Sequence, residues 1–157
     1  MKKYFTGFLT IVLLVLCAAC ASGGEAKLSI SAQELYQQIQ EAVSLPSMSS
    51  LDQEGIYNLY GVAPENYTAS LFYTSDAPEK GDMILFFEAK DADAAKEIAQ
   101  AMENDLEQQR NASNNYYPEK YALLEGVEPK VDGVYVYAVA SEDRDTILQI
   151  IEKALHQ

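Results

Sequence analysis

The chain has 157 residues and a formal net charge of −13 at pH 7, because 24 acidic side chains outnumber 11 basic ones. This balance disfavours nucleic-acid binding, since neutralising phosphates requires clustered lysine and arginine. One histidine and two cysteines are too few for a zinc site built from these residue types. The length is typical of one domain with its own hydrophobic core.

The chain begins with the pattern of a secretory signal peptide. Two lysines precede an apolar run over residues 8–16 that is interrupted by a single threonine. Two alanines then precede Cys20, an order that resembles a bacterial lipobox, although Cys17 stands where that motif usually has leucine. The resemblance implies removal of residues 1–19 as a lipoprotein signal peptide and attachment of a diacylglyceryl group to the sulfur of Cys20.

This interpretation places the protein at the extracytoplasmic face of the cell membrane, held by its lipid. Residues 20–29 then contain the lipidated cysteine and a flexible tether, and residues 30–157 form a single globular domain without a thiol. Because the domain is acidic and has no polybasic patch, we expect membrane contact through the covalent lipid only. Three alternatives remain open: ordinary cleavage after Ala21, an uncleaved transmembrane helix, for which the run is shorter than the required ~20 apolar residues, and a cytosolic protein with an unusually apolar N-terminus.

The first predicted helix begins at Ala32 and ends near Ser44. Ser31 and Glu34 have the spacing of a capping box at its start. Leu45 is followed by a proline, which disfavours further helix. Residues 47–66 are predicted to be irregular or to contain one short helix over residues 52–60.

Two strands are predicted next, over residues 67–75 and 82–89, joined by a turn at residues 76–81. In the first strand, Tyr67 and Leu71 are predicted to share one face because side chains alternate along a strand. The second strand is apolar on both faces, which predicts a central position in the sheet or helices on both sides.

The remaining predicted elements are, in chain order, a long helix over residues 91–109, a break at 111–115, a short helix over 117–124, strands over 127–131 and 134–140, and a final helix over 142–156 capped by Ser141. The turn at Asp132-Gly133 is a strong hairpin signal. The element order α-β-β-α-(α)-β-β-α predicts an α+β fold. We expect a mostly antiparallel sheet of about four strands, in two hairpins, packed by three main helices.

Several stretches carry a resemblance to a known family: the lipobox at Cys20, the apolar strand Met83–Phe87, the corner Tyr117-Pro118-Glu119, and Gly133–Tyr137 before the last helix. At these positions the chain resembles small Gram-positive bacterial lipoproteins catalogued as a domain of unknown function. The resemblance covers most of residues 30–157. It implies a location and an architecture but no reaction.

The sequence contains no recognisable catalytic or metal-binding arrangement, so we expect no catalytic residues, no metal and no cofactor. The only histidine, His156, lies next to the end of the chain, where an imidazole is poorly positioned. Asp91 and Asp93 are interpreted as a helix start and not as a calcium loop, which would need a glycine and a closing glutamate. The acidic clusters at residues 103–107 and 142–145 are interpreted as solvated helix surfaces.

Tyrosine is the one unusual residue type, with 11 copies and no tryptophan. The candidate binding surface consists of Tyr116, Tyr117, Tyr121 and Arg110, because tyrosine is enriched in binding surfaces. Packing with exposed hydroxyls is the alternative explanation, and it applies equally to the tyrosines of the last strand.

These features predict a membrane-anchored, non-enzymatic accessory lipoprotein that binds an envelope protein or a cell-wall component. The alternative is a small-ligand or cation-binding lipoprotein that uses its acidic, tyrosine-rich surface. A carboxylate hydrolase is a third hypothesis, which requires two acids that converge in a concave pocket.

Overall fold

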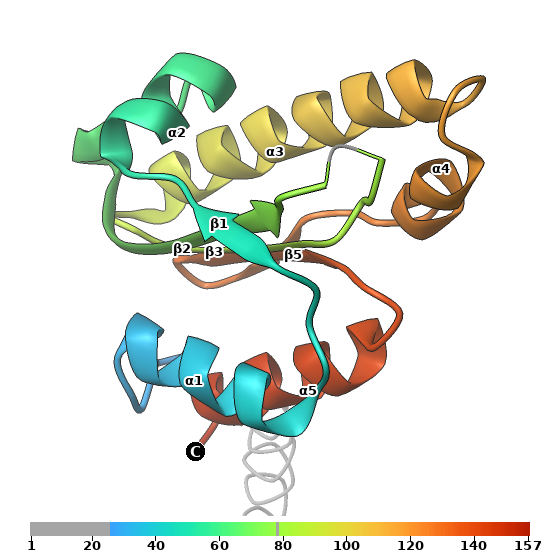
Figure 1. Ribbon diagram of the computed structural model, residues 1–157. Coiled ribbons are helices and arrows are strands. Elements are labelled where there is room, and N and C mark those ends of the chain that lie inside the picture. Colours follow the sequence, from blue (N-terminus) through green and yellow to red (C-terminus); the bar gives the residue numbers. More distant parts are fainter. Residues whose placement is uncertain (1–25, 78) are drawn as a thin grey trace, which may run out of the picture.

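A five-stranded sheet lies between two layers of helices in the computed structural model, which describes residues 26–77 and 79–157 (Figure 1). The strand order is β1-β2-β3-β5-β4, and every neighbouring pair is antiparallel. The strands are β1 (Met48–Ser50), β2 (Tyr67–Ser75), β3 (Met83–Ala89), β4 (Lys130–Asp132) and β5 (Tyr135–Ala140). The helices are α1 (Ala32–Ala42), α2 (Gln53–Tyr60), α3 (Ala92–Ser113), α4 (Pro118–Leu124) and α5 (Arg144–Leu155), with a 3₁₀ turn, η1 (Pro64–Asn66). The expected signal peptide and Cys20 lie outside the described residues.

The central position predicted for β3 is confirmed. It pairs with β2 on one side and β5 on the other. Phe86 is fully buried among side chains of α1 and α5, whereas Phe87 is fully buried among side chains of α2, α3 and α4. The sheet therefore separates two hydrophobic cores, and the apolar character of both faces of β3 follows from this.

The α+β class is confirmed, but the described residues contain five strands and five α-helices instead of about four strands and three main helices. The additional strand is β1, which pairs with residues 73–75 of β2 in the stretch predicted to be irregular. It is three residues long and ends in two exposed serines, so it has no apolar alternation to reveal it. The short helix predicted for the same stretch is present as α2.

The helix α3 is longer than predicted and passes through most of the expected break. Its last residue is Ser113, whose buried hydroxyl donates to the carbonyl oxygens of Gln109 and Arg110. This hydroxyl finds its partners within the helix, as serine side chains in helices often do. The break follows only at Asn114.

The second hairpin is shorter than predicted on its first strand. Val127 was placed in a strand, but it is fully buried in the core beneath α3, and β4 begins only at Lys130. Pro129 lies between them and cannot donate a hydrogen bond to a strand. The turn at Gly133, with φ of 61°, is in the left-handed region that the hairpin requires.

The predicted face assignment of β2 is wrong at its first residue. A bulge between Tyr67 and Ala69 shifts the pairing register. Tyr67 consequently packs edge-on against Phe87, with ring centroids 5.1 Å apart, on the α3 side of the sheet. Leu71 lies on the opposite side, with α1 and α5.

The starts of the first and last helices are built differently. The capping box of α1 is confirmed, since Ser31 accepts from the Glu34 amide and Glu34 accepts from the Ser31 amide. Helix α5 begins at Arg144, and its N-cap residue, Asp143, makes no side-chain capping bond. The hydroxyl of Ser141 accepts from the amide of Asp143, directly before the first helical residue, so the predicted cap acts on the approach to the helix.

The first described residues are fixed to the end of α5. The amides of Lys27 and Ser29 donate to the carbonyl oxygens of Leu155 and Ala154, each at 3.0 Å. The Leu28 amide donates to the hydroxyl of Tyr135 at 3.0 Å. The last part of the segment expected to be a flexible tether is therefore bonded to the domain.

Candidate functional site

The large apolar side chains that remain exposed gather on one side of the sheet. Among the described residues they are Tyr57 and Leu59 of α2, Tyr116 and Tyr117 between α3 and α4, and Val131 of β4. Val131 lies against side chains of α3. None of these five residues belongs to α1 or α5. We call the surface of α2, α3, α4 and the Tyr116–Tyr117 turn the α2–α3–α4 face (Figure 1).

The turn between α3 and α4 presents two of the predicted binding tyrosines to solvent. The amides of Tyr116 and Tyr117 both donate to the carbonyl oxygen of Ser113, at 3.1 Å and 2.8 Å. Pro118 then starts α4, one residue after the predicted start of this helix. Tyr116 is 79% exposed and Tyr117 is 44% exposed, whereas Tyr121 is partly buried on α4. The backbone thus holds two neighbouring rings outward, and their role in binding stays a prediction.

Arg110 is the fourth residue of the predicted surface, and its guanidinium is engaged within the domain. One terminal nitrogen donates to the carbonyl oxygen of Val127 at 2.9 Å, and the other lies 2.7 Å from a carboxylate oxygen of Glu103. Arg110 therefore attaches the connection between α4 and β4 to α3. Its guanidinium is bonded to other groups of the domain and does not project into solvent as the tyrosine rings do.

The tyrosines of the last strand fit the packing explanation. Tyr135 and Tyr137 share a face of β5, and both are buried in the core with α1 and α5. Burial raises the pKa of Tyr137 to about 12. These two residues belong to the core. The exposed tyrosine rings lie on the α2–α3–α4 face.

A groove of about 370 Å³ opens in this face where α2, α3 and α4 meet the turn between β2 and β3. We call it the first groove. Its lining residues are Leu59, Tyr60, Thr74, Ser75, Ala77, Lys80, Gly81, Asp82, Met83, Asp105, Gln109 and Lys120. The exposed Leu59 lies at this groove, which connects the groove to the apolar part of the face.

Two carboxyl groups of the first groove are partly removed from water. Burial raises the pKa of Asp105, and the amide of Gln109 donates to this carboxylate at 2.7 Å. Burial is also the main cause that raises the pKa of Asp82. Burial, followed by the nearby charge of Asp105, raises the pKa of the Tyr60 hydroxyl. The groove therefore combines two partly buried carboxyl groups, beside Lys80 and Lys120, with an apolar rim.

A second groove, of about 350 Å³, lies on the other side of the same turn and shares Lys80, Gly81, Asp82 and Lys120 with the first. Gly81 separates the two. A Cβ atom at this position would come within 3.2 Å of the Lys120 side chain and 3.3 Å of its carbonyl oxygen. The close approach of the turn to α4 thus defines the wall between the grooves.

The interpretation of the acidic clusters as solvated helix surfaces holds for Glu142, Asp143 and Asp145, which are exposed, but not for Asp105, which is partly buried. Asp105 lines the first groove, and Glu142 and Asp143 line the second, each with Asp82. Asp82 and Asp105 thus line one groove, and the carboxyl groups would also have to converge to meet the condition set for the hydrolase hypothesis. Within residues 26–77 and 79–157, no group of three or more histidine, cysteine, aspartate or glutamate side chains could hold a metal ion.

His156 is better fixed than its position near the chain end indicates. Its Nε2 atom lies 2.7 Å from a carboxylate oxygen of Asp132, which joins the end of α5 to β4. This contact lies on the opposite side of the sheet from the first groove. It stabilises the end of α5 and leaves the histidine remote from Asp82 and Asp105.

Asp105→Asn tests the electrostatics of the first groove. Because the folded pKa of Asp105 lies above its unfolded value of about 3.9, protonation stabilises the folded state. That stabilisation is complete below the unfolded pKa and is lost as pH rises through the folded pKa. We expect Asp105→Asn to raise the free energy of unfolding at neutral pH, with the gain disappearing toward about pH 3. Urea denaturation at both pH values measures it.

Glu107→Gln is the matched control, since Glu107 is exposed on the same helix. We expect its free energy of unfolding to stay within about 0.5 kcal/mol of the wild type at both pH values. Equal stabilisation by both variants would show that net charge, and not burial of Asp105, governs the effect.

Sequence comparison places the chain in a family. The sequence matches the domain of unknown function DUF4358 over residues 41–141. The chain belongs to the DUF4358 family. No curated protein and no solved structure matches it.

The DUF4358 match extends from the end of α1 to Ser141 and contains all five described strands together with α2, α3 and α4. Every residue that lines the first groove lies within it. Helix α5 lies beyond its end. The α2–α3–α4 face is thus part of the family domain itself. Among the described residues, no helix combines the length and apolar character needed to cross a membrane.

Proposed function

We propose that this DUF4358 protein is a lipoprotein of the cell envelope, anchored at the extracytoplasmic side through Cys20, that binds a protein partner without catalysing a reaction. The observation that carries the proposal is the location of the five exposed large apolar side chains, all on the α2–α3–α4 side of the sheet. Contiguous exposed apolar surface is typical of interaction sites, and the adjacent Tyr116 and Tyr117 provide such a surface on this face. The signal-like N-terminus and the lipobox pattern support the location.

The tyrosines give this face properties suited to a protein partner. Tyr116 and Tyr117 offer broad ring surfaces with polar hydroxyls, and the two bonds to Ser113 hold their backbone in one conformation. Binding to such rings costs little conformational entropy. Tyrosines are also frequent among the residues that dominate binding energy. Leu59 adds an aliphatic contact at the first groove, where an apolar or cationic side chain of the partner can lie near Asp105.

Site-directed photocrosslinking in intact cells tests the proposal. A photoreactive residue at Tyr116 should capture a specific envelope protein, identified by mass spectrometry, whereas the same residue at Gln37 on α1 should not. We expect Tyr116→Ala to weaken binding of the purified partner about 30-fold, a loss of about 2 kcal/mol. Identical capture from both positions, or none from Tyr116, would contradict partner binding by this face.

A second candidate function is binding of a small amine or cation in the first groove. The specific observation is that Asp82 and Asp105 both line it, with Lys80 and Lys120 beside them, and that burial raises the pKa of each carboxyl group. Calorimetry with Ca²⁺ and with cell-wall fragments measures this, and Asp105→Asn should abolish any heat of binding. Flat titrations would end this candidate. If the protein instead cleaves the fragments, and Asp82→Asn abolishes this cleavage, the result would support the hydrolase hypothesis.

A further inference from the structure

We infer that the surface formed by α1 and α5 lies against the membrane, with the phospholipid headgroup layer occupying the groove between these two helices. This inference rests on the proposed lipidation of Cys20. It specifies how the anchored domain is oriented, and it turns the α2–α3–α4 face away from the bilayer (Figure 1).

The first argument is the place where the described chain begins. The bonds of Lys27 and Ser29 to the last carbonyl groups of α5 fix this segment at the C-terminal end of that helix. Ala26 is only six positions after Cys20. Even a fully extended chain of that length spans only about 20 Å. A lipidated Cys20 would therefore keep the end of α5 close to the membrane surface.

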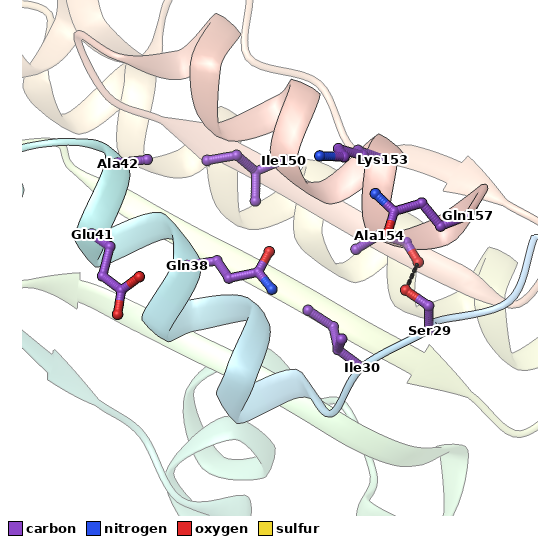
Figure 2. Close-up of a pocket in the computed structure, with 9 residues that line it drawn as sticks. All are labelled: Ser29, Ile30, Gln38, Glu41, Ala42, Ile150, Lys153, Ala154 and Gln157. Carbon is purple, nitrogen blue, oxygen red and sulfur yellow. Dashed lines mark hydrogen bonds between the residues drawn. The ribbon is translucent and has the colours of Figure 1, made fainter.

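The second argument is the chemistry of the groove between α1 and α5, which has a volume of about 310 Å³ (Figure 2). Figure 2 shows Gln38 of α1 across from Lys153 and Gln157 near the end of α5. These three side chains carry N–H donors, which suit phosphate oxygens. The partly buried Ile30 and Ile150 also line the groove, and Glu41 adds an acidic side chain.

The third argument is the uneven distribution of charge. The helices α1 and α5 together carry four acidic and two basic side chains, whereas α2, α3 and α4 together carry seven acidic and three basic ones. An anionic leaflet repels the acidic domain as a whole, so the covalent lipid must supply the attachment. Repulsion nevertheless acts most strongly on the α3 side. It therefore favours the orientation in which α1 and α5 face the lipid.

Fluorescence quenching in vesicles tests the orientation. The lipidated protein is purified and reconstituted into vesicles of phosphatidylglycerol and phosphatidylcholine that contain a lipid with a nitroxide on its headgroup. Removal of the signal peptide removes Cys17, and lipidation blocks the sulfur of Cys20, so the mature chain has no free thiol. The variants Gln38→Cys and Gln100→Cys can therefore each carry a single fluorophore. Both positions are glutamines, Gln38 at the groove and Gln100 exposed on α3. We expect severalfold stronger quenching at position 38, and equal or stronger quenching at position 100 would overturn the inference.

Lys153→Gln in the Gln38→Cys background tests the groove itself. Removing one positive charge near an anionic surface should weaken the contact about fivefold, seen as reduced quenching at position 38. The reduction should be absent in vesicles of phosphatidylcholine alone. Unchanged quenching with phosphatidylglycerol would overturn the headgroup contact. Mass spectrometry of the Cys20 peptide separates the two proposals: an unmodified Cys20 removes both, whereas a lipidated protein quenched equally at both positions removes only this one.

Discussion

Replacing Cys20 with alanine is expected to abolish membrane attachment of the protein. A diacylglyceryl group attaches only to a cysteine sulfur, and the acidic domain offers no polybasic patch that could hold it to an anionic leaflet. Each buried methylene of an acyl chain contributes ~0.8 kcal/mol, so losing the chains removes the whole of the anchoring free energy. Cell fractionation should find the variant outside the membrane fraction, and labelled palmitate should no longer be incorporated.

Cys17→Ala is the matched control, because it removes the other cysteine three positions away and should leave attachment unchanged. The pair also separates the alternatives for the N-terminus. Ordinary cleavage after Ala21 predicts a wild-type protein that is already released. An uncleaved helix predicts that both variants stay in the membrane. Membrane retention of Cys20→Ala would therefore contradict the lipoprotein proposal.

The parts of the fold that the sequence predicted well are those encoded by local patterns. The capping box at Ser31 and Glu34 needs only three residues of separation. The strand β3 is recognisable because its apolar residues occupy both faces, and this pattern has one common explanation, a central strand covered on both sides. In both cases the signal lies within a single element.

The strand β1 and the bulge in β2 depend on contacts between distant segments. Met48–Ser50 becomes a strand only because the edge of β2 is available for pairing. The bulge moves Tyr67 to the opposite side from Leu71, and strict alternation gives no sign of it. Sequence patterns report which side chains avoid water, but they do not report which strand supplies the hydrogen bonds.

The candidate site was only partly predictable for the same reason. The exposed tyrosines were visible as a cluster in sequence, since Tyr116 and Tyr117 are adjacent. The sequence does not connect Asp82 with Asp105, because they come to line one groove only when α3 and α4 pack on the turn before β3. One signal was available: Asp105 lies three residues after the buried Met102, at the border of the apolar stripe of α3. A carboxylate at that border is a candidate for partial burial.

The largest expected loss of stability follows from Phe86→Ala. Phe86 is fully buried on the central strand, with its ring centroid 5.8 Å from that of Tyr135 and 6.4 Å from that of Tyr137. Removing the ring leaves a cavity that these neighbours and α1 and α5 cannot close, so we expect the free energy of unfolding to fall by about 3–5 kcal/mol. Such a loss approaches the whole stability of a typical domain, which is about 5–15 kcal/mol. Urea denaturation followed by circular dichroism measures it.

The location of Phe86 predicts which part of the molecule responds. Because it packs only on the α1–α5 side of the sheet, amides of α5 should lose hydrogen-exchange protection before those of α3 do. Val131→Ala is the control: this side chain is 50% exposed, so its truncation should cost less than about 0.5 kcal/mol. If Phe86→Ala cost no more than this control, the sheet would not divide the interior into two cores. The face assigned to the membrane and the face assigned to the partner would then lose their structural basis.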